Sequence, residues 1–86
     1  MKRKIICYDL HGADSNDYLS IYDYIEVSLK GVRVTESVFV AFTDISNSEL
    51  RDKLSNMFGG NISVIVNDFP VGASWVNLKN ADKWKM

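Results

Sequence analysis

The sequence has little cysteine, little proline and no excess of one charge, and each shortage excludes a class of protein. Its one cysteine, Cys7, forms no internal disulfide, so nothing predicts a secreted fold held by disulfide bonds. Ten basic and eleven acidic residues give a formal net charge of −1, unlike the strongly basic domains that bind any nucleic acid. No apolar run approaches the ~20 residues of a membrane helix, and the run after the basic residues 1–4 is too short for a signal peptide. We therefore expect a cytoplasmic protein without a membrane span.

The composition that remains is that of a protein with a packed core. Of 86 residues, 47% are hydrophobic and 12% are aromatic, which predicts a single domain over residues 1–86. A domain of this size buries only about two-thirds of its unfolded surface, and we expect further burial in a homodimer. Residues 70–86 form a tail that contains Trp75 and Trp84. This tail is expected to pack on its own domain or on the dimer, with residues 73–76 as an extra strand.

The hydrophobic periodicity predicts an α+β fold. Apolar runs and turn residues indicate, in order, a strand over residues 3–10, a helix over 15–30, a long strand over 32–42, a helix after the capping box Ser46-Asn47-Ser48-Glu49 and a strand over 61–69. A bend near residues 35–37 splits the long strand and gives the ferredoxin-like order β-α-β-β-α-β. Both helices then cover one face of an antiparallel sheet, and the sheet of an identical chain covers the other.

The first helix is expected to begin at a Ser15 or Asn16 cap. Its apolar face is predicted from residues at spacings of three and four, which are Tyr18, Tyr22, Ile25 and Leu29, widened by Leu19, Ile21 and Val27. Tyr24 is off this stripe and is expected to be exposed.

Asp9 is the main candidate for chemistry, because it ends the first strand beside a turn-rich stretch. A carboxylate on a rigid strand end can bind a metal ion, or it can hydrogen-bond the loop backbone in an Asx-turn. A metal site of Asp9, His11 and Asp14 is a second interpretation. Ser37 is a poor nucleophile candidate, because His11 is the one histidine that might activate it.

The residues Tyr8-Asp9 at the end of the first strand and Ser37-Val38-Phe39 on a later strand, followed by an amphipathic helix and a strand, resemble a known family. The chain is similar to the CRISPR-associated protein two superfamily over roughly residues 3–69, and most similar to its SinR-like branch. Virulence-associated protein D, an endoribonuclease, looks like a more distant relative. The resemblance implies a ferredoxin-like homodimer in which the Asp9 residues of both chains bind a divalent metal such as magnesium. Tyr8, Ser37 and Phe39 match the family motif.

Two hypotheses about function follow from these residues and the resemblance. The first is a non-catalytic homodimeric scaffold or accessory module that binds nucleic acid or an unidentified protein. It is favoured by the net charge of −1 and by Asp14 and Asp17, which follow Asp9 where the family has basic residues. The alternative is a magnesium-dependent endonuclease, acting on RNA or DNA through Asp9 residues paired across the dimer.

Overall fold

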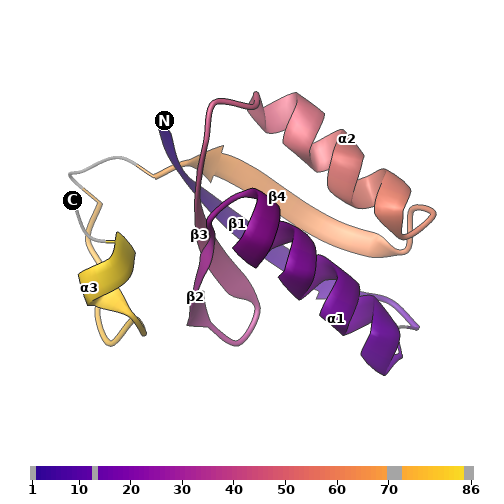
Figure 1. Ribbon diagram of the computed structural model, residues 1–86, viewed down its shortest axis with the longest axis horizontal. Helices are drawn as coiled ribbons and strands as arrows, with labels where there is room; N and C mark the ends of the chain where they lie inside the picture. The colour runs from indigo at the N-terminus through magenta and orange to yellow at the C-terminus, as the bar shows by residue number, and fades with distance from the viewer. Residues whose placement is uncertain (1, 13, 70–72, 85–86) are drawn as a thin grey trace.

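The computed structural model describes residues 2–12, 14–69 and 73–84. Its elements, in chain order, are β1 (Lys2–Leu10), α1 (Ser15–Asp23), the π-helical segment η1 (Tyr24–Ser28), β2 (Val32–Thr35), β3 (Val38–Thr43), α2 (Asn47–Met57), β4 (Ile62–Asp68) and α3 (Ala81–Trp84). Figure 1 shows α1 and α2 crossing in front of the strands and the short α3 beside β2. The predicted α+β class is therefore confirmed.

The strands form one four-stranded sheet in the order β2-β3-β1-β4, with every neighbouring pair antiparallel. This order is compatible with a small ferredoxin-like fold. The predicted split of the long strand is also confirmed, because Glu36 and Ser37 form the turn between β2 and β3. A register shift between Arg33 and Thr35 accommodates that turn, as a β-bulge does.

The main core lies between the sheet and the two long helices. Alternate residues of β1 face this core, and Ile6, Tyr8 and Leu10 are all buried there. The helices contribute Ile21, Ile25, Leu29, Leu50 and Leu54, and β3 contributes Phe39 and Ala41. The helix after the capping sequence ends at two glycines with positive φ, Gly59 and Gly60, as its sequence predicted.

The first helix departs from its prediction at both ends. Its N-cap is Asp14, whose side chain accepts from the Asp17 backbone N–H in a capping box, so neither Ser15 nor Asn16 is the cap. Toward its C-terminus the chain widens into η1, which changes the angle between successive side chains. The predicted apolar face is wrong at Leu19, in α1, and at Val27, in η1, which are 63% and 64% exposed.

The exposure of the tyrosines in α1 and η1 also differs from the prediction. Tyr24 packs against the core and has the Lys53 ammonium 5.7 Å from its ring centroid, so the prediction that it is exposed is wrong. Tyr18 is the more exposed ring. The helix end then closes tightly: the Gly31 N–H donates to the Ile25 carbonyl at 2.8 Å, and a Cβ at position 31 would lie 2.4 Å from the Ile25 Cγ2.

A second, smaller core lies on the opposite face of the sheet, over β2 and β3. Val34 and Val40 are buried there against Phe69 and Trp84, with Leu78 and Ala81 packed around them. The described residues of the tail, 73–84, therefore contribute to a core of their own domain. Residues 73–76 form no strand, so the predicted extra strand is wrong, and this half of the face is covered without a second chain.

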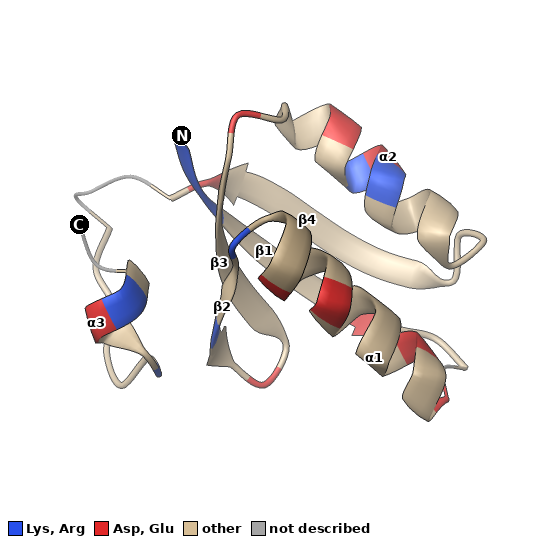
Figure 2. Ribbon diagram, in the orientation of Figure 1, with Lys and Arg blue, Asp and Glu red and all other residues tan. Residues whose placement is uncertain are grey.

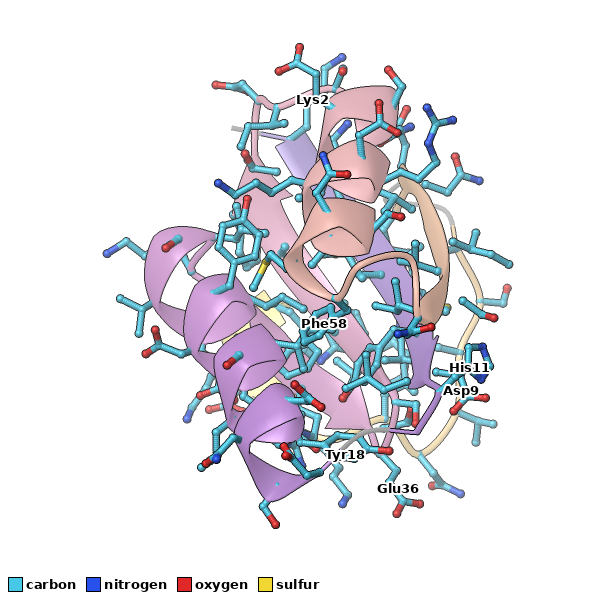
Figure 3. All side chains as sticks on the ribbon, turned by 90° about the vertical axis from the view of Figure 1, so that its right-hand side faces the viewer. Lys2, Asp9, His11, Tyr18, Glu36 and Phe58 are labelled. Atoms are coloured by element: carbon cyan, nitrogen blue, oxygen red, sulfur yellow. The ribbon has the colours of Figure 1, made fainter. Side chains whose placement is uncertain are left out.

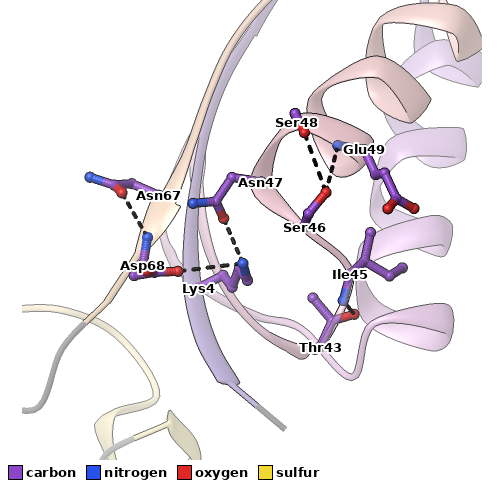
Figure 4. Close-up of polar contacts among 9 residues, drawn as sticks. All are labelled: Lys4, Thr43, Ile45, Ser46, Asn47, Ser48, Glu49, Asn67 and Asp68. Atoms are coloured by element: carbon purple, nitrogen blue, oxygen red, sulfur yellow. Dashed lines mark hydrogen bonds and ion pairs between the residues drawn. The ribbon is translucent and has the colours of Figure 1, made fainter.

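The start of β1 and the described end of the tail meet at this second core, and two of the three basic residues that open β1 are buried. Arg3 and Lys4 are only 8% and 4% exposed. The Arg3 guanidinium donates to the carbonyls of Phe69 and Trp84, at 3.0 and 3.1 Å. On the helix-covered face, the Lys4 ammonium lies 2.6 Å from the Asn47 Oδ1 and 3.4 Å from an Asp68 carboxylate oxygen (Figure 4). Both cationic side chains therefore bind other parts of the same domain.

Candidate functional site

The tail leaves part of the second sheet face open. We define the open half-face as the outward side chains of β1 and β4 near one end of the sheet, Cys7, Asp9, Ser63 and Ile65. The register pairs Cys7 with Ile65 and Asp9 with Ser63 across the two strands. Ile65 is 68% exposed and Cys7 is half-buried. Together with parts of Tyr8 and Val64, these residues line a shallow hollow of about 220 Å³.

Asp9 lies on this open half-face, next to the end of β1 and with an exposed side chain. It points away from the helices because Tyr8 and Leu10, on either side of it, point into the main core. Within residues 2–12, 14–69 and 73–84 its carboxylate makes no hydrogen bond or ion pair. The Asx-turn interpretation therefore fails for the described loop residues, and the carboxylate faces solvent.

Ser63 is a site residue that the sequence prediction missed. Its Oγ lies 2.7 Å from the Nε2 of His11, in a hydrogen bond between β4 and the residue that follows β1. The His11 N–H also donates to the Asn61 carbonyl at 3.0 Å, so the backbone pairing of the two strands continues to this position. Figure 3 shows His11 and Asp9 next to each other at the edge of the molecule. Ser63 and Ile65 are two residues apart on one strand, so their side chains point to the same face. This spacing was the feature of the sequence that could have placed Ser63 on the open half-face.

The family-motif residues gather around the same end of β1, where Tyr8 and Phe39 are buried and Ser37 is exposed. The Tyr8 N–H donates to the Ser37 carbonyl at 3.1 Å, and the Tyr8 hydroxyl lies 3.5 Å from the Glu36 carbonyl. Ser37 is in the turn before β3 and not on the strand itself. Phe39 is fully buried, and its ring stacks on Tyr8 with centroids 6.0 Å apart. These contacts hold the β2–β3 turn against β1.

The environment of Tyr8 disfavours its ionised form. Burial of the hydroxyl is the first cause, and the neighbouring Tyr22 hydroxyl adds to it, so the pKa of Tyr8 is well above its ordinary value. The Arg33 guanidinium, which lies 4.0 Å from the Tyr22 ring centroid, opposes the shift. Tyr8 is therefore a neutral core residue at ordinary pH, with no role as a proton acceptor.

No group of three or more histidine, cysteine, aspartate or glutamate side chains gathers within the described parts of the chain. The site interpreted from Asp9, His11 and Asp14 is therefore not formed, because Asp14 is engaged as the N-cap of α1. Cys7 lies two residues before Asp9 on the same face, and burial raises the pKa of its thiol. That shift disfavours the thiolate that binds metals.

A larger hollow, about 640 Å³, lies elsewhere, on the outer side of α1 and η1. It is lined by Leu19, Asp23 and Glu26 together with polar neighbours, and it is widely open to solvent. Figure 2 shows acidic residues along α1 and no basic residue on it. Asp23 and Glu26 make this surface acidic, and none of the residues that line it is a cation.

The chain was compared with protein-family models, curated proteins and solved structures, and none of them matches it. The resemblance to the CRISPR-associated protein two superfamily therefore stays a prediction from short motifs. Among the helices that the structure describes, none is long and apolar enough to span a membrane.

Proposed function

We propose that the chain is a homodimeric, non-catalytic binding module with a ferredoxin-like fold, in which two copies pair through their open half-faces. The observation that carries the proposal is the exposure of Ile65, 68%, on the edge strand β4 of a sheet face whose β2–β3 half is covered by the described part of the tail. Burying such an apolar side chain contributes about 1.5–3 kcal/mol per copy. A second copy supplies the same apolar strip, as a two-fold symmetric interface requires.

Surface charge favours a protein over a nucleic acid as the partner of this dimer. Arg3 and Lys4 are buried in the fold, so the basic start of the chain offers few cations to phosphates. The α1 surface is acidic, with Asp14, Asp17 and Asp23 and no lysine or arginine between residues 14 and 29. An acidic surface repels a phosphate backbone and attracts a basic protein surface.

A charge placed at Ile65 tests the dimer. Ile65→Lys puts an ammonium at the proposed interface, whereas Leu19→Lys, at a position 63% exposed on α1, makes the same change elsewhere. Light scattering at micromolar concentration should give a dimer for the wild type and Leu19→Lys and a monomer for Ile65→Lys. A monomeric wild type, or a dimer that persists in Ile65→Lys, contradicts the proposal.

A second candidate function is a magnesium-dependent endonuclease, and the placement of Asp9 favours it. The carboxylate is exposed, has no partner among the described residues and lies on the same open half-face as Ile65. One carboxylate is a poor magnesium site, because the ion takes six oxygen ligands and keeps several waters. Two Asp9 residues across a dimer would fit the ion better, and the bound magnesium would supply an activated water.

Nuclease activity is tested on single- and double-stranded RNA and DNA, with magnesium or manganese added, for the wild type and Asp9→Asn. The endonuclease candidate expects cleavage that Asp9→Asn abolishes and that Asp44→Asn, an exposed carboxylate outside the sheet, retains. No cleavage by the wild type, or equal cleavage by Asp9→Asn, leaves the non-catalytic module as the function.

A further inference from the structure

Asp9 and His11 are two residues apart at the end of one strand, and this spacing brings their side chains to the same face. Residues i and i+2 of a strand point the same way, with Cα atoms about 6.8 Å apart. The pairing of the His11 N–H with the Asn61 carbonyl keeps His11 in this regular geometry although β1 ends at Leu10. Leu10 is buried between them and anchors the backbone. A carboxylate and an imidazole so spaced can reach a common point above the sheet.

Ser63 fixes one side of the imidazole. Its Oγ lies 2.7 Å from the His11 Nε2, a contact in which either atom can be the donor. In the tautomer that metal binding through Nδ1 requires, Nε2 carries the ring proton and the Ser63 hydroxyl accepts the hydrogen bond from it. The other ring nitrogen, Nδ1, then carries a lone pair. Histidines that bind metals typically donate their second ring N–H to a protein acceptor, which fixes the tautomer and the ring orientation. Ser63 can be such an acceptor, because its Oγ is within hydrogen-bond distance of the His11 Nε2.

We propose that Asp9 and His11 together bind a divalent transition-metal ion, with zinc bound more tightly than magnesium. The ligands are a carboxylate oxygen of Asp9 and the His11 nitrogen that faces away from Ser63, with water completing the coordination. Imidazole nitrogen suits zinc and related ions, whereas magnesium requires oxygen ligands in a near-ideal octahedron. The site is formed within one chain, so it does not depend on the dimer and goes beyond the functions proposed above.

The Cys7 thiol is the other group on this face at which zinc could bind, because it lies two residues before Asp9. The Cys7 side chain is half-buried. A strand separates Cys7 and His11 by about 13.6 Å along its axis, too far for both to bind one ion at ~2 Å. The site therefore consists of Asp9 and His11, and Cys7→Ser is the control for zinc bound at the thiol.

The chain has one histidine, and this makes the test direct. Protein without a histidine tag is titrated with zinc chloride or magnesium chloride, while calorimetry gives the affinity and NMR follows the imidazole C–H signals of His11. We expect zinc to shift these signals at concentrations where magnesium does not. Asp9→Asn and His11→Gln should abolish the calorimetric zinc binding. Ser63→Ala should weaken it about 10–100-fold, as loss of a second-sphere hydrogen bond does.

Two variants serve as matched controls that should bind zinc as the wild type does. Asp44→Asn removes the same charge outside the sheet, and Cys7→Ser removes the thiol. Zinc binding that survives Asp9→Asn or His11→Gln, or that is lost in Cys7→Ser, overturns the proposal, as does equal affinity for magnesium. Unchanged affinity in Ser63→Ala overturns the role of Ser63. The oligomeric state, measured without metal, reports on the proposed dimer separately.

Discussion

Arg3, near the start of the chain, donates a hydrogen bond from its guanidinium to the carbonyl of Trp84, 81 residues later, at 3.1 Å. The same guanidinium lies 4.4 Å from the Phe69 ring centroid and donates to the Phe69 carbonyl. The first strand, the end of the last strand and the last helix therefore meet at one buried cation. This contact fixes the tail over the β2–β3 half of the sheet and leaves the open half-face uncovered.

Trp84→Ala should lower the free energy of unfolding by about 3–5 kcal/mol, the usual cost of removing a buried large aromatic. The indole is only 1% exposed, packs against Phe69 at 5.4 Å between centroids, and donates its N–H to the Lys79 carbonyl. Trp75→Ala is the matched control, because Trp75 is 42% exposed. Urea unfolding followed by circular dichroism checks both, and equal losses would mean that Trp84 does not hold the tail.

Arg3→Met should lower the free energy of unfolding by about 1–3 kcal/mol, because buried carbonyls lose a charged donor. Methionine keeps much of the apolar stem, so the loss reports mainly on the hydrogen bonds to Phe69 and Trp84. Lys2→Met is the control, since Lys2 is exposed, and its effect should stay within about 0.5 kcal/mol. Urea unfolding of the two variants separates these outcomes, and an effect of Lys2→Met as large as that of Arg3→Met would contradict the assigned role.

The strands and helices were largely predictable because each depends on a local pattern. Valines alternate with other residues over much of 32–40, and Ser46 with Glu49 forms a recognisable helix start. Both patterns can be recognised from the local sequence alone. The course of the tail was open, because Leu78, Ala81 and Trp84 have no strand or helix period long enough to indicate their partners. Val34 and Val40, which they cover, are about forty residues away and are fixed by the fold alone.

The candidate site was half predictable for the same reason. Asp9 was found from its place after an apolar run, and His11 from its neighbourhood. Ser63 was missed because its contact with His11 depends on the β1–β4 register, which pairs Asp9 with Ser63 across 54 positions of sequence. The change from α1 to η1 was also hidden, because the wider turn follows from packing and the Gly31 closure.

Asp14→Ala should lower the free energy of unfolding by about 0.5–2 kcal/mol, the usual effect of losing an N-cap. The Asp14 side chain accepts from the Asp17 N–H at 3.0 Å, and the Asp17 side chain accepts from the Asp14 N–H at 3.1 Å. Ser15→Ala is the control, because Ser15 is the first helical residue after the cap and alanine has a high helix propensity. A greater loss in Ser15→Ala than in Asp14→Ala, measured by urea unfolding, would mean that Ser15 caps the helix after all.

The stability of the protein should fall as the pH rises above about 10, because of Tyr8. Burial raises the pKa of the Tyr8 hydroxyl well above its ordinary value of 10.0, so the folded chain keeps this proton. The unfolded chain releases it near the ordinary value. Above that pH the unfolded state binds fewer protons than the folded state, so the stabilisation that is complete below it is progressively lost.

Urea midpoints measured between about pH 8 and pH 11 check this dependence on Tyr8. Tyr8→Phe should make the decline above about pH 10 less steep, at the cost of the 3.5 Å contact between the hydroxyl and the Glu36 carbonyl. Part of the decline should remain, because burial also raises the pKa of Tyr24. Burial also raises the pKa of the Cys7 thiol from 9.0, so Cys7→Ser should remove only a part of the decline that begins at lower pH. The hydroxyl should ionise less readily in the folded state than in the unfolded state, because Tyr8 is buried between Phe39 and the β2–β3 turn. A decline as steep in Tyr8→Phe as in the wild type would contradict this prediction.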